Sequence, residues 1–328
     1  MKKIVFYPNA GKKGYSNPYC QNYKDSLKSQ MEVETRFEKL NISQVYLFLN
    51  LFSGDIYILN WIEDLPNHKF SYLQFAFVKF CVFIIKIRRK KIIWMFHNFH
   101  SHSNNSSILN FKTRNLLLNK SDLIISHSKD GAQFANQYAH CKVIYKCHPV
   151  AKIIQPLIDS QQFDVLIWGD IFPYKGVSEF LNYVKYKTHS LRIKIIGKCV
   201  DNYLICNIKE SCSKNVIFEN RRASLKEIYS YVQSCKYVLF PYIGDSISSS
   251  GALIDTIAMG GTPIGPCIGA FKDLSDEGVC LSYNSYDELY NILVMSKIII
   301  SQKIRNEFVI KNSWENFANC IYKEILDL

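Results

Sequence analysis

A cluster of serine and glycine residues stands directly before a helical pattern in the second half of the chain. Residues 245–251 read Asp-Ser-Ile-Ser-Ser-Ser-Gly, and an apolar run with helical spacing follows. The first turn of a helix has unpaired backbone N–H groups and the positive end of the helix dipole, a combination that suits a phosphate group. Asp255, one turn further on, is predicted to accept hydrogen bonds from sugar or ribose hydroxyls. The alternative is a serine N-cap without a ligand. The residues predicted to bind the phosphate are Ser248, Ser249, Ser250 and Gly251.

A second candidate is the segment from Gly169 to Gly176, which follows an apolar run ending at Trp168. Glycine permits a close backbone approach, and Lys175 supplies a point charge that suits a diphosphate. A lysine in a loop can equally be a solvated side chain, so this segment alone is a weak signal.

Three histidines follow the apolar run Ile92–Phe96, at positions 97, 100 and 102. Because no distant ligand set is apparent in the sequence, a metal site is the less favoured interpretation. We expect hydrogen bonding and acid–base capacity toward a polar substrate instead.

Several common reaction motifs are absent from the sequence. Residues 11–14 lack the spacing of a Walker-type phosphate loop, and no Gly-x-Gly-x-x-Gly of a nicotinamide dehydrogenase is present. There is no Gly-x-Ser-x-Gly elbow of an α/β-hydrolase and no Asp-x-Asp for manganese.

Short β-rich runs alternate with longer helical patterns along the whole chain, which predicts parallel sheets in two doubly wound α/β domains. Ligands of such sheets bind beyond the carboxyl ends of the strands, where the candidate loops lie. The domain boundary is predicted near Pro149–Gln162. The expected strands are Ile4–Tyr7, Val45–Leu51, Ile56–Leu59, Ile92–Phe96, Leu123–Ser126, Phe163–Trp168, Arg192–Ile196, Val216–Glu219, Tyr237–Phe240 and Thr262–Ile264.

The composition favours a folded protein with anionic partners. Of 328 residues, 48% are hydrophobic, and 40 Lys and Arg against 28 Asp and Glu give a net charge of +12. Nucleic acid, phosphorylated small molecules and acidic membranes all fit that charge. Eleven scattered cysteines without a C-x-x-C pair are read as reduced thiols, and the apolar run at the N-terminus is too short for a signal peptide. A cytoplasmic location is expected.

The segment from Phe70 to Ile87 is nearly all apolar and is followed by four basic residues, 88–91. Lys79 at its centre makes it borderline as a membrane span. We expect an interfacial helix on anionic lipid, with the alternative of a buried helix in an α/β domain. Its apolar side is predicted to carry Phe70, Leu73, Phe77, Phe80 and Ile84.

The order of the motifs resembles that of GT-B glycosyltransferases that build bacterial surface polysaccharides. In the first half, residues 17–19, 55–61, 93–102, 121–128 and 148–150 are similar to motifs of that family. In the second half, residues 169–176 resemble its Gly-x-Ile-x-x-Tyr-Lys-Gly, residues 240–242 its Leu-Pro-Tyr, and residues 250–255 its donor-binding helix. Residues 313–315 resemble the start of its last helix.

The resemblance implies two Rossmann-like domains facing a cleft. It implies an acceptor-binding domain over residues 1–152, a nucleotide-sugar domain over 153–310, and a helix over 311–328 that crosses back. The implied catalytic residues are His97, His102 and Lys175. The implied donor-binding residues are Gly169, Lys175, Lys198, Tyr242, Ser248, Ser249, Ser250, Gly251 and Asp255, and the implied acceptor-binding residues are Asn17, Tyr19, Trp61 and His100.

The sequence departs from the family at three places. Ile247 stands where the first acid of a Glu-x(7)-Glu pair is expected, and Asp255 replaces the second. Ser101 and Ser103 replace a Pro and a Glu of the histidine loop, and Phe172 stands where an arginine is common. Diphosphate stabilisation is therefore expected from Lys175 and the helix end.

The first hypothesis is sugar transfer from a UDP- or GDP-linked donor to a lipid-linked or free saccharide, without a metal or other cofactor. Residues Phe70–Lys91 would attach the protein to the anionic inner face of the cell membrane. The alternatives are a sugar-nucleotide epimerase of the same shape and a basic nucleic-acid-binding protein, although no specific nucleic-acid motif is present.

Overall fold

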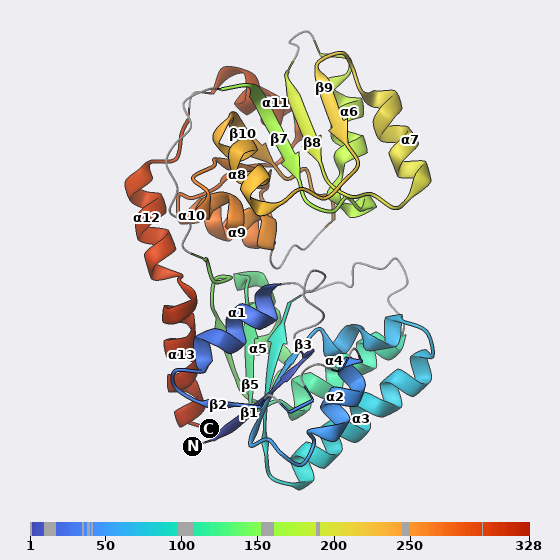
Figure 1. Ribbon diagram of the computed structural model, residues 1–328, viewed down its shortest axis with the longest axis vertical. Coiled ribbons are helices and arrows are strands. Elements are labelled where there is room, and N and C mark those ends of the chain that lie inside the picture. Colours follow the sequence, from blue (N-terminus) through green and yellow to red (C-terminus); the bar gives the residue numbers. More distant parts are fainter. Residues whose placement is uncertain are drawn as a thin grey trace. The chain divides into compact units, whose positions relative to one another are not determined.

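The computed structural model describes residues 2–9, 18–34, 36–37, 40, 42–97, 108–151, 161–187, 191–244, 250–296 and 298–328. The chain divides into two compact units. The first comprises Met1–Cys147 together with Trp314–Leu328, and the second comprises His148–Ser313. Each unit is built on one parallel sheet, and Figure 1 shows both.

The first unit holds a six-stranded sheet in the order β2-β1-β3-β4-β5-β6. All its pairings are parallel, so each connection returns across a face of the sheet, usually through a helix. The central strands are buried on both faces, which explains their continuous apolar runs. The strands are β1 (Lys3–Tyr7), β2 (Glu32–Val33), β3 (Ile56–Asn60), β4 (Lys91–Phe96), β5 (Leu123–Ser126) and β6 (Lys142–Tyr145).

Helices cover both faces of this sheet. One core joins it to α2, α3, α4 and α5, while a second joins it to α1 and α13 (Figure 1). The chain therefore leaves the first unit after Cys147 and contributes its last helix to that unit's core. The bounds are α1 (Pro18–Leu27), α2 (Ser43–Leu49), η1 (Ile62–Asn67), α3 (Ser71–Ile87), α4 (Ile108–Lys120), α5 (Lys129–Tyr138) and α13 (Trp314–Leu326).

The second unit holds a six-stranded parallel sheet in the order β12-β11-β10-β7-β8-β9. Strand order reverses direction at the β7–β10 pair, which is the topological switch point of a doubly wound sheet. The strands are β7 (Phe163–Trp168), β8 (Ile193–Ile196), β9 (Val216–Glu219), β10 (Cys235–Leu239), β11 (Pro263–Pro266) and β12 (Leu281–Tyr283).

Serine and aspartate side chains begin several helices of the second unit. Ser224, Ser250, Ser285 and Ser301 each accept a hydrogen bond from a backbone N–H three residues on, as does Asp201. The elements are η2 (Pro173–Lys175), α6 (Val177–Val184), α7 (Asn202–Ser211), α8 (Leu225–Gln233), α9 (Gly251–Ala258), α10 (Gly269–Asp276), α11 (Tyr286–Met295) and α12 (Gln302–Lys311).

One predicted strand is wrong. Val45–Leu51 lies mostly within helix α2, where Tyr46 and Leu47 are buried and Phe48 and Leu49 are exposed. Leu51 beyond the helix is buried again, so the buried positions follow a helical period rather than an alternation. A short apolar run does not by itself distinguish a helix from a strand. Sequence reasoning also missed β2, β6 and β12, which are short strands near the sheet edges.

Helix α3 contains the long apolar segment, and no helix over the described residues is both long and apolar enough to span a bilayer. Three of the five side chains predicted for its exposed apolar side, Phe70, Leu73 and Phe80, are exposed, as are Phe83 and Ile87. The other two, Phe77 and Ile84, pack against the core. The sequence placed these two incorrectly because α3 is apolar on nearly every side, which removes the contrast that orients a helix.

Gly176 marks a close backbone approach beside the β7–β10 pair. It has φ +63°, and a Cβ placed on it would lie 2.0 Å from the Pro241 carbonyl oxygen. Gly176→Ala should lower the free energy of unfolding by on the order of 2–3 kcal/mol, through left-handed strain and displacement of that carbonyl. Chemical denaturation followed by circular dichroism measures the change.

Gly251→Ala is the matched control. A Cβ at Gly251 would meet no atom within 4 Å, so the free energy of unfolding should change by less than about 0.5 kcal/mol. Equal destabilisation by the two variants would contradict the steric argument.

Candidate functional site

The best-defined polar site of the second unit lies at the carboxyl ends of β7 and β10. The segment after β7 carries Gly169 and Lys175, and the segment after β10 carries Tyr242. The Ile243 N–H donates to the Tyr174 carbonyl at 2.8 Å, which joins the two segments. This pair of strands is the switch point, where open α/β sheets bind their ligands.

A hydrogen-bonded chain runs from Lys175 to the start of helix α9. Lys175 Nζ donates to Tyr242 Oη at 2.7 Å, and Tyr242 Oη lies 3.3 Å from Ser250 Oγ. Ser250 is the N-cap of α9 and accepts from the Leu253 N–H. Three residues predicted separately from the sequence, Lys175, Tyr242 and Ser250, are thus in one chain of contacts.

Gly169 lies beside this chain. It has φ +101°, and a Cβ on it would lie 4.0 Å from Lys175 Nζ and 3.9 Å from the Ala252 side chain. A side chain here would be strained and would contact both the lysine and the first turn of α9. Gly251 is exposed at that first turn, where backbone N–H groups have no partner within the helix.

Lys175 is a charged group held in a largely enclosed position. Burial lowers its pKa, but Tyr242 and Tyr174 outweigh burial, so that the pKa of Lys175 lies above its ordinary value. The ammonium therefore keeps its charge at neutral pH. Together with the positive end of the α9 dipole, it gives this corner of the unit a positive potential.

Asp255 lies one turn into α9 and is half-buried. Burial raises the pKa of Asp255 to about 6. Its carboxylate has no hydrogen-bond partner among the described residues. A carboxylate in such surroundings gains most from hydroxyl donors supplied by a ligand.

A mainly apolar pocket of about 200 Å³ opens next to Gly169. Asp170 and Arg222 form a bidentate ion pair at its rim, with N–O distances of 3.0 and 2.7 Å. The indole of Trp168 is fixed by a hydrogen bond from Nε1 to Thr256 Oγ1 at 2.9 Å. The pocket is lined by Trp168, Gly169, Asp170, Ile196, Gly197, Arg222, Ala223, Leu225 and Ile228.

Lys198 does not join the hydrogen-bonded chain in this structure. Its side chain is exposed, and its backbone carbonyl accepts a hydrogen bond from the Ile171 N–H at 2.9 Å. Its assignment to donor binding stays a prediction.

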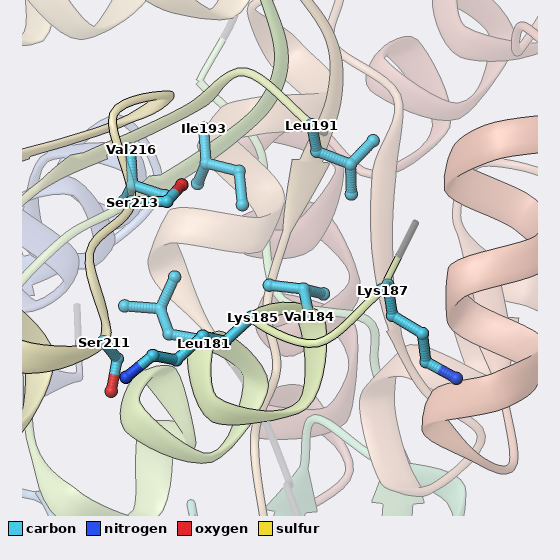
Figure 2. Close-up of a pocket in the computed structure, with 9 residues that line it drawn as sticks. All are labelled: Leu181, Val184, Lys185, Lys187, Leu191, Ile193, Ser211, Ser213 and Val216. Atoms are coloured by element: carbon cyan, nitrogen blue, oxygen red, sulfur yellow. The ribbon is translucent and has the colours of Figure 1, made fainter. Parts of the chain in front are cut away.

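A second pocket, of about 120 Å³, lies beside the amino ends of β8 and β9, away from these ligand-binding edges (Figure 2). Its walls are the aliphatic side chains of Leu181, Val184 and Ile193, among others. Lys185 donates to the Glu210 carbonyl, and Lys187 points away from the aliphatic group and pairs with Asp287. Ser211 and Ser213 also line the pocket, and the Ser211 hydroxyl is hydrogen-bonded to Asn182 and to the Asn207 carbonyl. We assign no chemistry to this pocket.

In the first unit, His97 lies directly after β4 and is buried. Asn60 Nδ2 donates to the Tyr7 carbonyl at 2.9 Å, which fixes the amide and directs Asn60 Oδ1 to His97 Nε2 at 3.1 Å. His97 Nε2 is therefore the protonated nitrogen of that contact. The imidazole also stacks on Trp61, with centroids 4.1 Å apart and planes at 15°.

Tyr19 lies on α1 and connects His97 with a second histidine. Its ring meets His97 edge to face at 5.1 Å, and its hydroxyl lies 2.7 Å from His127 Nε2. His127 Nδ1 lies 2.7 Å from the Lys146 carbonyl, which can only accept. His127 Nδ1 therefore carries the proton, and His127 Nε2 accepts. Because burial raises the pKa of Tyr19, the Tyr19 hydroxyl keeps its proton and donates to His127 Nε2.

The predicted residues Asn17, His100, His102, Ser248 and Ser249 lie outside the described residues. Sequence reasoning missed Asn60, His127 and the Asp170–Arg222 pair as site residues. A usable signal existed for Asn60 and His127, because each lies at or just after the carboxyl end of a strand, as His97 does. Within the described part of the chain, no group of three or more His, Cys, Asp or Glu residues could hold a metal ion.

The two sheets, each doubly wound, and the return of α13 to the first unit define the GT-B fold of glycosyltransferases. HepE of Anabaena, solved in complex with UDP-glucose, is similar over 100% of both chains with a TM-score of 0.71 and 13% identity. Sucrose-phosphate synthase of Thermosynechococcus elongatus is similar over 100% of both chains, with a TM-score of 0.70 and 11% identity.

The lipopolysaccharide outer core galactosyltransferase WaaB is similar over 99% of this chain and 100% of its own, with a TM-score of 0.67 and 12% identity. No protein-family model matches the chain, and no curated protein matches its sequence. The identities are low, so these likenesses establish the fold.

The raised pKa of Asp255 predicts a pH-dependent stability. The folded state holds this proton up to about pH 6, whereas the unfolded chain releases it near pH 3.9. Between those pH values the folded state binds more protons than the unfolded chain, so the free energy of unfolding falls as the pH rises. Asp255→Asn should become more stable relative to the unmodified protein from about pH 4 to pH 6, by on the order of 2 kcal/mol, and should then level off.

Urea denaturation of the two proteins across that range measures the difference. A difference that does not vary with pH would contradict the assignment. Asp287→Asn serves as the control, because Asp287 pairs with Lys187 on the surface and its pKa is lowered.

Proposed function

We propose that the chain is a glycosyltransferase that takes a sugar from a nucleotide-diphosphate donor bound to its second unit. The observation that carries the proposal is the chain of contacts from Lys175 through Tyr242 to the Ser250 end of α9. The leaving group of such a reaction is a nucleoside diphosphate, so the main requirement is stabilisation of developing negative charge. An ammonium and a helix amino end supply that stabilisation directly, so we propose a reaction without a metal ion.

We assign the remaining groups of the second unit to the rest of the donor. The apolar pocket beside Gly169 suits a planar nucleobase, and Asp255 suits the hydroxyls of the ribose or the sugar. UDP is the favoured nucleotide, because the similar HepE was solved with UDP-glucose and with UDP. Lys198, Ser248 and Ser249 remain proposed donor-binding residues.

The first unit would hold the acceptor. We propose that His97 contacts the transferred sugar, with His102 as a second catalytic group and Asn17, Tyr19, Trp61 and His100 around the acceptor. A saccharide carried on a lipid diphosphate is the proposed acceptor, in surface-polysaccharide synthesis at the cytoplasmic face of the membrane. The likeness to WaaB, a lipopolysaccharide outer core galactosyltransferase, supports an acceptor saccharide that is attached to a lipid.

Donor binding is tested by thermal shift with UDP, GDP and their sugar conjugates, without metal. Ligand at a hundred times its dissociation constant should add about 2.7 kcal/mol of stability. Lys175→Ala should weaken UDP binding by about 10- to 100-fold, because a hydrogen bond to a charged group contributes on the order of 1.5–3 kcal/mol. Titration calorimetry gives the two constants.

Lys209→Ala is the control for this experiment, since Lys209 is exposed on α7 of the same unit and the charge change is identical. If both variants weakened UDP binding equally, the effect would come from the change in net charge, and this would contradict a specific role of Lys175. Absence of a shift with every nucleotide would refute the proposed donor site.

His97 is tested by separating binding from turnover. His97→Asn should reduce kcat of sugar transfer by about 100-fold or more, in the range of positioned acid–base and hydrogen-bonding groups. UDP affinity should stay within about twofold, because the donor contacts are in the other unit. If kcat of His97→Asn were unchanged, His97 would not be a catalytic residue.

A further inference from the structure

Helices α2 and α3 present a continuous apolar face to solvent. Phe48 of α2 stacks on Phe80 of α3 with ring centroids 6.3 Å apart, so the two helices form one surface. We call this the α2–α3 face. Its exposed large side chains are Val45, Phe48, Leu49, Phe52, Tyr72, Leu73, Phe80, Phe83 and Ile87.

The folded unit does not need this face for its core. The buried side of α3 consists of Val78, Cys81, Val82 and Ile85, which pack against the sheet. Yet Phe83 is 59% exposed and Ile87 is 64% exposed on the other side. When a surface helix is apolar on both sides, only one side can pack against the core, and the other faces solvent. A large exposed apolar patch of this kind marks an interaction surface.

The segment of the chain that contains α3 carries charges of one sign. The 57 residues from 65 to 121 contain ten Lys and Arg and no Asp or Glu. Lys86, Lys90 and Lys91 form ion pairs with Asp122 or Asp55, which lie outside that segment. Lys69, Lys79 and Arg89 are exposed and pair with no acidic side chain among the described residues.

Cationic side chains also lie against the aromatic rings themselves. The Arg88 guanidinium lies 5.3 Å from the centre of the exposed Phe52 ring, and Lys79 Nζ lies 5.6 Å from the Phe75 ring. Surfaces that enter the headgroup region of a bilayer typically combine aromatic side chains with neighbouring lysine and arginine.

We propose that the α2–α3 face docks on the surface of an anionic lipid bilayer, with Phe80 and Phe83 entering the acyl boundary and the cations contacting lipid phosphates. A second copy of the chain is disfavoured as the occupant, because a two-fold contact would bring two surfaces of the same positive charge together. The inference concerns α2 and α3 jointly, and it holds whether or not the chain transfers sugars.

Vesicle co-sedimentation tests the inference without donor or acceptor. The full chain is mixed with vesicles of phosphatidylcholine, or of phosphatidylcholine with phosphatidylglycerol. We expect sedimentation with the anionic vesicles only, and a loss of binding at high salt as the phosphates are screened. Phe80→Glu/Phe83→Glu should reduce the partition coefficient by about tenfold or more.

The matched control is Tyr203→Glu/Ile299→Glu, which makes the same charge change at exposed apolar positions of the second unit and should bind as the unmodified protein does. Thermal unfolding verifies that each variant folds. If Phe80→Glu/Phe83→Glu does not fold, Leu73→Glu/Ile87→Glu replaces it, since both side chains are more than 60% exposed.

Three results would overturn the proposal. The first is no sedimentation of the unmodified protein with anionic vesicles, and the second is equal sedimentation with neutral ones. The third is a concentration-dependent dimer, seen by analytical ultracentrifugation without lipid, that Phe80→Glu/Phe83→Glu abolishes. Failure of sugar transfer affects none of these readouts, so the two proposals fail separately.

Discussion

The close approach of two backbone segments at the β7–β10 switch point is the constraint on which the second unit depends. Gly176 allows the segment after β7 to lie against the Pro241 carbonyl, and the hydrogen bond from Ile243 to Tyr174 holds the segments in register. Only in that register do Lys175 and Tyr242 meet. A local steric condition at one glycine thus fixes the position of a charge and, through Ser250, its relation to the α9 dipole.

The first unit uses a comparable arrangement with different chemistry. Its switch point lies between β1 and β3, and Asn60 crosses it by donating to the Tyr7 carbonyl while accepting from His97. The second unit places a fixed positive charge at its switch point, whereas the first places hydrogen-bonded imidazoles between aromatic rings. Under the proposed function, the first kind of site would hold the anionic leaving group and the second an uncharged saccharide.

The local features of this structure could be predicted from the sequence. The alternation of β-rich runs with helical patterns predicted the parallel sheets. The positions of Lys175 and Ser250 after their strands predicted a common site, because the carboxyl ends of parallel strands lie along one edge of the sheet. The helical state of residues 45–49 and the exposed positions of α3 could not be predicted, since both segments lack the polar positions that orient an element. Asn60, His127 and the Asp170–Arg222 pair acquire their roles from contacts between residues far apart in the sequence, which no local pattern encodes.

The membership of α13 in the first unit bears on the order in which the protein folds. Phe317, Ala318, Ile321 and Ile325 complete a core that otherwise consists of residues before Cys147. During synthesis the second unit can therefore finish its core while this face of the first sheet is covered by α1 without α13. Vectorial folding normally runs from the N-terminus onward. Here the first unit to begin is the last to close, so part of its apolar core stays exposed to solvent until α13 has been synthesised.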